Sequence, residues 1–299
     1  MESIHDSSGP YALLSQRVYA WAKDQPAILA VLTIGSRARQ IKPADEWSDL
    51  DLILFTRDPE PYRKSSGWLQ QIGDVLLTVL DSTGRGDPEW LVLFFDGSKG
   101  DFAFAQAPEP VNREPSLQEL LSATADYQDV YQHGIYCLLD NTNPANEGLS
   151  IPWDPIPLTH PIQTDVLDCI NHFWMDALRA AKFLRREDLW RAFHTCNGIM
   201  KQQILQMAEW HARAQHGLEY NTWYGGRYLD EWADARLVQQ LPAAFGGYNQ
   251  SQLETALWNT IMMFTWLAQE TATLLSLIYP IQVETKMIKL IRTTIDSEG

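Results

Sequence analysis

The sequence is short of positive charge. Its 299 residues include 23 Lys or Arg against 38 Asp or Glu, which gives a formal net charge of −15. Binding to nucleic acid without sequence preference depends on neutralising phosphates with Lys and Arg. The charge balance therefore disfavours a nucleic-acid partner, and with it a polymerase or tRNA-modifying role. It suits a cationic partner, and it equally suits an acidic surface that keeps a cytosolic protein in solution.

Cysteines and long apolar runs are also scarce. Cys137, Cys169 and Cys196 cannot all pair with one another and lack metal-ligand spacing, so we expect reduced thiols in a cytoplasmic protein. The N-terminal MESIHDSSGP has no apolar core, and we expect no signal peptide. The most apolar late stretch, 261–280, is broken by a Gln-Glu pair and several Thr, which predicts a buried helix and no membrane span.

Short apolar runs separated by turn residues fill the first half of the chain. The predicted strands are 28–34, 50–55, 74–80, 91–95, 101–105 and an edge strand at 135–140, and residues 11–23 have helical spacing. The turn-forming DGSKG between the fourth and fifth runs predicts a hairpin. We expect an α+β protein whose first domain, 1–150, has a mixed sheet of about five strands flanked by helices.

The second half has helical periodicity. A stretch rich in Pro, Asn and Gly, 140–161, is the best candidate for a linker. Further helices are expected at about 188–216, 228–240 and 250–278. The helix expected from Asp165 has a predicted apolar face of Val166, Ile170, Phe173, Ala177, Ala181 and Leu184, and a polar side of Asp165, Asp168, His172, Met175, Arg179, Lys182 and Arg186. The second domain, 151–299, is therefore predicted to be an all-helical bundle.

Two aspartates, Asp49 and Asp51, open a run predicted to be a buried strand. The period of two places both side chains on the same face of that strand. Two carboxylates side by side repel each other unless a cation lies between them, and paired hard oxygens suit Mg²⁺. Acidic residues at strand ends are also commonly just solvated. The Asp-x-Asp pair alone leaves both interpretations open.

A Gly-Ser turn upstream favours the metal interpretation. Gly35 and Ser36 directly follow the first predicted strand. Glycine lets a backbone approach a phosphate, and serine adds a hydroxyl donor. Arg37 and Arg39 follow at once and are suited to pairing with phosphate oxygens. A strand, a Gly-Ser turn and then an Asp-x-Asp pair together predict a nucleotide phosphate site.

Gly35-Ser36 followed by Asp49-x-Asp51 resembles the nucleotidyltransferase superfamily that includes DNA polymerase beta. In order, GSRA…DEWSDLDL, LFFDGSKGDFAFA, HGIYCLLD, NHFW…AAKFLRRED and MAEWHARAQHGL…GGRYL resemble the streptomycin (aminoglycoside) 6-adenylyltransferases over about residues 15–290. The resemblance implies AMP transfer from ATP to an aminoglycoside hydroxyl with release of pyrophosphate, as in antibiotic resistance. It also implies an N-terminal nucleotidyltransferase domain and a C-terminal helical substrate-binding domain.

The resemblance implies roles for three further residues. Asp101 stands where the superfamily has a third carboxylate, which either completes the metal site or accepts the proton of the attacking hydroxyl. Lys182 matches the family's K-x-L-x-R segment and is a candidate phosphate contact, or otherwise a surface lysine. Arg227 is a candidate nucleotide contact, although the family pattern usually has Lys there.

Substrate contacts are predicted on the helices. Asp168 and Asp176 are candidates to meet the ammonium groups of a substrate, with a solvated helix face as the alternative. Trp174, with Trp210 and Trp223, is a candidate aromatic wall for adenine or sugar, with ordinary core packing as the alternative.

The expected partners are ATP and a small cationic hydroxyl-bearing substrate, with Mg²⁺ as cofactor and with no nucleic acid or membrane. The chain is expected to be a monomer. Two other functions stay open: a nucleotidyltransferase of the same fold acting on another hydroxyl compound, and a non-catalytic nucleotide-binding or antitoxin-like protein. Retention of Ser36, Asp49, Asp51 and Asp101 together argues against a degenerate site.

Overall fold

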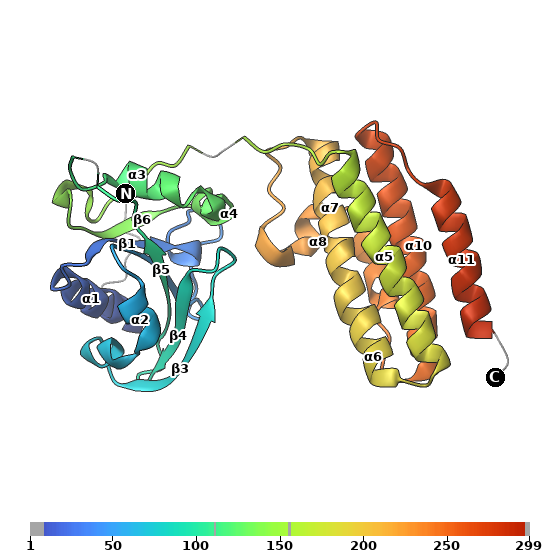
Figure 1. Cartoon of the computed structure of the whole chain (residues 1–299), viewed down its shortest axis with the longest axis horizontal. Coiled ribbons are helices and arrows are strands. Elements are labelled where there is room, and N and C mark those ends of the chain that lie inside the picture. Colours follow the sequence, from blue (N-terminus) through green and yellow to red (C-terminus); the bar gives the residue numbers. More distant parts are fainter. Residues whose placement is uncertain (1–8, 111, 155–156, 297–299) are drawn as a thin grey trace. The chain divides into compact units, whose positions relative to one another are not determined.

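The computed structural model describes residues 9–110, 112–154 and 157–296. The chain divides into two compact units, residues 1–156 and 157–299 (Figure 1). The division falls inside the stretch rich in Pro, Asn and Gly. The first part of that stretch belongs to the first unit, because Ser150 bridges to Tyr136 and the Asp140 side chain is fully buried.

A six-stranded mixed sheet forms the centre of the first unit. Its strands are β1 Ile28–Ile34, β2 Leu50–Thr56, β3 Val75–Ser82, β4 Pro88–Phe94, β5 Lys99–Gln106 and β6 Tyr136–Asp140. Their order is β3-β4-β5-β2-β1-β6, with β2 and β5 parallel and the other neighbours antiparallel. The predicted fold class is confirmed. The predicted count of five strands is wrong, because the short run ending at Asp140 pairs with β1 as a full edge strand.

Helices cover both faces of this sheet. They are α1 Pro10–Lys23, α2 Glu60–Lys64, α3 Leu117–Ala123 and α4 Gln128–Tyr131, with the 3₁₀ turns η1 Gly35–Arg37, η2 Gly67–Gln71, η3 Ala125–Tyr127 and η4 Pro144–Asn146. Leu14 of α1 packs in one core cluster with Leu52, whereas Leu120 of α3 packs in the other with Ile53. Adjacent residues of β2 point to opposite faces because side chains alternate along a strand.

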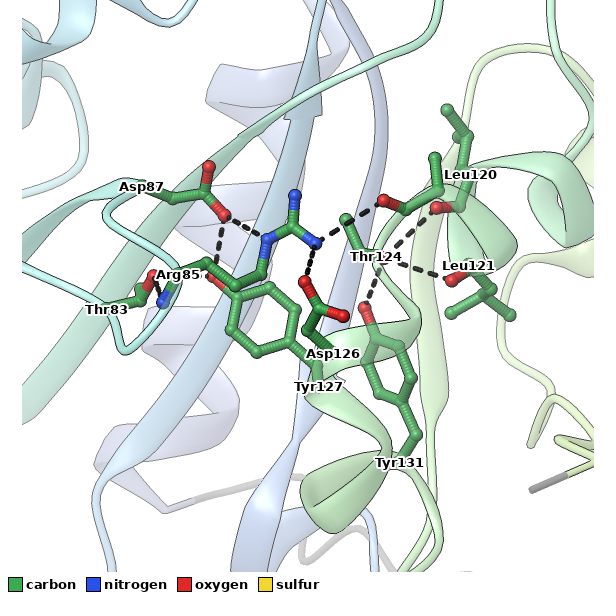
Figure 2. Close-up of polar contacts among 10 residues, drawn as sticks. Thr83, Arg85, Asp87, Leu120, Leu121, Thr124, Asp126, Tyr127 and Tyr131 are labelled. Carbon is green, nitrogen blue, oxygen red and sulfur yellow. Dashed lines mark hydrogen bonds and ion pairs between the residues drawn. The ribbon is translucent and has the colours of Figure 1, made fainter. Parts of the chain in front are cut away.

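A polar network fastens the turn between β3 and β4 to the α3–α4 segment (Figure 2). Arg85 donates from Nε to Asp87 Oδ2 at 3.0 Å and from Nη1 to Asp126 Oδ2 at 3.2 Å. The Tyr127 hydroxyl lies 2.8 Å from both Thr83 Oγ1 and Asp87 Oδ2. These contacts join segments far apart in the sequence. They hold the β3–β4 hairpin against α3 and α4, which cover the face of the sheet that contains Ile53.

The second unit is helical, as predicted. Its helices are α5 Gln163–Arg185, α6 Leu189–His194, the π-helical η5 Thr195–Ile199, α7 Met200–His216, α8 Leu229–Trp232, α9 Ala235–Gln240, α10 Gln250–Leu274 and α11 Ile281–Asp296, with 3₁₀ turns η6 Tyr224–Gly226 and η7 Leu241–Ala244. All six residues of the predicted apolar face of α5 are buried. The last helix, α11, was not predicted. Within the described residues, no helix combines the length and apolarity that crossing a membrane requires.

A half-buried lysine supports the π-helical turn between α6 and α7. Lys201 donates from Nζ to the Cys196 carbonyl at 2.7 Å and to Thr260 Oγ1 at 2.8 Å. A π-helical turn interrupts the regular ladder of the helix and changes which carbonyls find partners. The ammonium supplies a donor at this point and ties α7 to α10. Burial lowers the pKa of Lys201 to about 8.

Replacing this lysine should change how stability depends on pH. The folded-state pKa of Lys201 lies below its ordinary value of 10.5, so between those values the unfolded chain binds more protons. The free energy of unfolding of the wild type should therefore rise with pH relative to Lys201→Met, by at most about 3 kcal/mol. Urea denaturation of both proteins, from neutral pH upward, measures the difference between their free energies of unfolding. The contributions of other titrating groups are common to both proteins and cancel in this difference. A difference that does not change with pH would contradict it.

Candidate active site

The predicted metal-binding aspartates lie at neighbouring ends of β2 and β5. Asp51 and Asp101 are direct partners in the parallel ladder, and Asp49 immediately precedes β2. Register partners on adjacent strands point to the same face. Since Ile53 lies two residues after Asp51, this is the face that α3 and α4 cover further along the strands. The sheet thus holds two carboxylates side by side at one end of that face.

Lys99 is a residue of this site that we did not predict. Its Nζ lies 2.7 Å from Asp49 Oδ2 and 3.0 Å from Asp101 Oδ2. Lys99 begins β5 two residues before Asp101, so both side chains project from the same face of the strand. The same period-two rule applied to KGD would have placed this lysine beside the carboxylate.

The surroundings of Asp101 are unfavourable for a negative charge. Burial and the nearby Asp49 raise the pKa of Asp101, although Lys99 acts in the opposite direction. Asp101 Oδ1 is buried and has no hydrogen-bond partner. On β4, burial raises the pKa of Glu89, and the charges of Asp101, Asp81 and Asp51 add to the shift. This end of the sheet therefore has more negative than positive charge, and one buried oxygen without a donor.

Gly35 brings the turn after β1 against Asp51. It has a φ of +66°, in the left-handed region that favours glycine. A Cβ built on Gly35 would lie well under 3.0 Å from Asp51 Oδ2, closer than real Cβ atoms come to a neighbour. The next residue, Ser36, is buried with 8% exposure. The predicted Gly-Ser turn and the predicted carboxylates therefore meet in one site.

Arg37 holds the loop that carries Asp49. Its Nε donates to the Asp49 carbonyl at 2.9 Å, and its Nη2 donates to the Ser48 carbonyl at 2.6 Å. The guanidinium also lies 3.8 Å from the centre of the Tyr11 ring. Burial lowers the pKa of Arg37, against the opposing effects of Tyr11, Asp51 and Asp49. Two of its nitrogens are thus occupied by backbone in this structure. The nearby Arg39 is buried and donates to the Lys42 carbonyl.

The donor chemistry of this site fits Mg²⁺. In the described part of the chain, no three His, Cys, Asp or Glu side chains are grouped to hold a metal ion. Mg²⁺, however, is usually held by one or two carboxylates, with waters and substrate phosphates filling the remaining positions. Asp51 and Asp101 supply two hard carboxylates in register, and Asp101 Oδ1 lacks a hydrogen-bond partner.

The remaining predicted site residues lie in the second unit. Asp168 and Lys182 are exposed on α5, and Arg227 is exposed just after η6. Trp174 is only 2% exposed and packs in the core of the helical unit, which leaves no face for a substrate. Asp176 is buried as well. It accepts from Arg179 Nη1 at 2.6 Å and from Gln203 Nε2 at 3.0 Å.

These two placements correct the predicted substrate contacts. The carboxylate of Asp176 has protein donors on both oxygens, so it ties α5 to α7 and is not offered to a ligand. Trp210 and Trp223 likewise pack, partly buried, against the helical core. The burial of these side chains follows from helices packing against more than one side of α5, which the sequence of α5 alone does not reveal.

Comparisons with known proteins identify the family of this chain. The family model described as streptomycin adenylyltransferase matches residues 12–294. An aminoglycoside 6-adenylyltransferase of Bacillus subtilis (strain 168) is 21% identical over 267 residues, 87% of this chain and 89% of that protein. One from Campylobacter jejuni is 23% identical over 273 residues, 89% of this chain and 90% of that protein.

A solved structure described as an aminoglycoside 6-adenyltransferase from Bacillus subtilis aligns with 95% of this chain and 98% of its own. It is 17% identical, with a TM-score of 0.46. The family assignment rests on the sequence match, which spans both units. The chain belongs to the streptomycin adenylyltransferase family and is an adenylyltransferase, a kind of nucleotidyltransferase.

Proposed function

We propose that this protein is a Mg²⁺-dependent aminoglycoside O-adenylyltransferase that acts on a streptomycin-like acceptor. The observation that carries the proposal is the in-register pair of Asp51 and Asp101, with the Gly35 backbone against Asp51. The names of the relatives support an aminoglycoside acceptor. The net charge of −15 suits a cationic substrate.

The reaction replaces one phosphorus–oxygen bond with another. A hydroxyl oxygen of the acceptor attacks the α-phosphorus of ATP, and the bond to pyrophosphate breaks. In this proposal Asp101 accepts the hydroxyl proton as a positioned general base at the end of β5. A positioned base contributes about 10²–10⁴ in rate. Mg²⁺ would neutralise charge on the phosphates, and Asp49, Asp51 and Asp101 are the residues that would hold it, although their carboxylates do not form a three-ligand group in this structure.

The Gly-Ser turn and Arg37 position the reacting groups. Ser36 lies in the turn after β1, from which its hydroxyl and the backbone reach phosphate oxygens. Arg37 keeps Asp49 beside Asp51 through its two bonds to the loop backbone. In-line positioning of the hydroxyl at the α-phosphorus provides much of the remaining acceleration. Lys182, Arg227 and Asp168 are proposed nucleotide and substrate contacts, because they are exposed on the second unit.

A pyrophosphate-release assay tests this function. Purified protein with ATP and Mg²⁺ should release pyrophosphate when streptomycin or another aminoglycoside is added, and should release none without an acceptor. Chelation of the metal should abolish the release. Mass spectrometry of the acceptor should show the addition of one AMP. Silence across a panel of aminoglycosides, with ATP still bound, would overturn the aminoglycoside acceptor and favour another hydroxyl compound.

A further inference from the structure

Lys99 projects into the proposed metal–nucleotide site from the start of β5. Its side chain is 36% exposed, whereas that of its partner Asp101 is 18% exposed. The ammonium therefore contacts the carboxylates while the lysine side chain as a whole keeps part of its surface exposed to solvent. Both of its acidic partners present their Oδ2 atoms to it.

We propose that Lys99 is a tethered counter-ion that moves during the reaction. Without nucleotide its ammonium holds Asp49 and Asp101 together. When Mg²⁺ and ATP bind, the ammonium leaves these carboxylates and pairs with the phosphates that depart as pyrophosphate. This inference rests on the proposed adenylyl transfer and adds a phosphate-contacting residue that the family match does not name.

Electrostatics makes the two cations compete. A divalent ion bound at Asp49 and Asp101 would lie close to an ammonium that keeps its present contacts, and like charges at such separations repel strongly. Asp101 Oδ1, which has no partner, is available to a metal, but Oδ2 is shared with Lys99. Binding of either cation therefore weakens binding of the other at these carboxylates.

The chemistry of lysine suits such a movement. Its ammonium is a compact point charge on a flexible four-carbon stem, and lysine is a common phosphate ligand. Arg37, the other cation beside these aspartates, bonds through two nitrogens to backbone carbonyls. Moving Arg37 would release the loop before β2, whereas moving Lys99 breaks only side-chain contacts.

Binding experiments without acceptor test the proposal. Mn²⁺, which electron paramagnetic resonance detects directly, replaces Mg²⁺ as the probe of the nucleotide-free protein. Lys99→Met should bind Mn²⁺ about fivefold more tightly than the wild type, the lower end of usual coupling between sites. In the presence of Mg²⁺, the same variant should bind inorganic pyrophosphate about fivefold more weakly. A misfolded variant would not strengthen one affinity and weaken the other.

Two variants serve as controls. Lys99→Arg keeps the charge and should bind both ligands with affinities close to those of the wild type. Lys64→Met removes a surface lysine that pairs with Glu60 at 3.8 Å, and it should change neither affinity. A further test variant, Lys99→Gln, removes the charge but keeps a polar side chain, and its two affinities should change as those of Lys99→Met do.

The outcomes separate this inference from the proposed function. Unchanged Mn²⁺ affinity in Lys99→Met, or no Mn²⁺ binding to any variant, would overturn the competition. Unchanged pyrophosphate affinity would overturn the movement to the phosphates. If both affinities shift as expected while no aminoglycoside supports pyrophosphate release, Lys99 keeps its role and the acceptor is wrong.

Discussion

Asp51→Asn should abolish adenylyl transfer while the first unit stays folded. Asp51 lies at one end of β2, between the backbone of Gly35 and its register partner Asp101. Asparagine has nearly the same shape but lacks the negative charge that a divalent cation requires. Loss of a preorganised electrostatic contact of this kind lowers turnover by about 10²–10³-fold or more. Pyrophosphate release and circular dichroism measure activity and folding, and Asp49→Asn should behave in the same way.

Asp101→Asn separates the roles of the two register partners. Because burial raises the pKa of Asp101, the charged carboxylate costs stability at neutral pH, and a neutral isostere removes that cost. The variant should therefore unfold at a temperature no lower than that of the wild type. It should still bind ATP, because Ser36, Asp49 and Asp51 are unchanged, but it should lose turnover. Enzymes commonly trade stability for activity in this way.

Asp81→Asn provides the matched control. Asp81 is an exposed residue of β3 opposite Glu89, in the same sheet but outside the Asp51–Asp101 pair. It should change neither activity nor folding appreciably. If Asp51→Asn or Asp101→Asn transferred AMP at the rate of Asp81→Asn, the corresponding role in the site would be wrong.

The strands and the main features of this site were predictable because both depend on local sequence. The predicted strand 28–34 coincides with β1, and the predicted 50–55 differs from β2 by one residue. Both strands are buried, so their apolar runs are nearly continuous, and the Gly-Ser turn and the aspartates sit directly at their ends. The parallel pairing of β2 with β5 then brings Asp101 to Asp51 from fifty positions away. Before the structure, only the family resemblance placed Asp101 in the site, and the pairing of the two strands was not predicted.

The contacts missed from the sequence depend on packing between distant elements. The polar side of α5 was predicted correctly, and its seven residues are exposed. Trp174 and Asp176 lie outside both predicted faces and are buried, because α5 packs against α7, α10 and α11. Its buried surface is therefore wider than the single apolar stripe of a surface helix. The last helix, α11, was missed although its sequence carries a signal: Met287, Ile288, Ile291 and Ile295 recur at helical spacing and pack on the helical core.

Gly35→Ala should also remove activity, because it introduces both backbone strain and a collision with Asp51. The backbone of Gly35 has a φ of +66°, and a non-glycine residue there costs about 1–2 kcal/mol. In addition, the new methyl group would collide with Asp51 Oδ2. The Asp51 carboxylate must then leave its present position beside Asp101. Displacements of about 1 Å in a catalytic arrangement can cost about 10²-fold in rate, so we expect a loss of that size or larger.

Two other glycines separate backbone strain from the collision. Gly86 has a φ of +88° with nothing within 4 Å of a built Cβ, so Gly86→Ala measures strain alone. Gly84 has neither a positive φ nor a neighbour within 4 Å, so Gly84→Ala should be neutral. Thermal unfolding should place Gly35→Ala at or below Gly86→Ala. In pyrophosphate release, only Gly35→Ala should be impaired. If Gly35→Ala lost stability as Gly86→Ala does but kept its activity, the approach of the turn to Asp51 would have no part in catalysis. Loss of activity in Gly35→Ala alone would show that catalysis requires Asp51 to keep its present position against the turn.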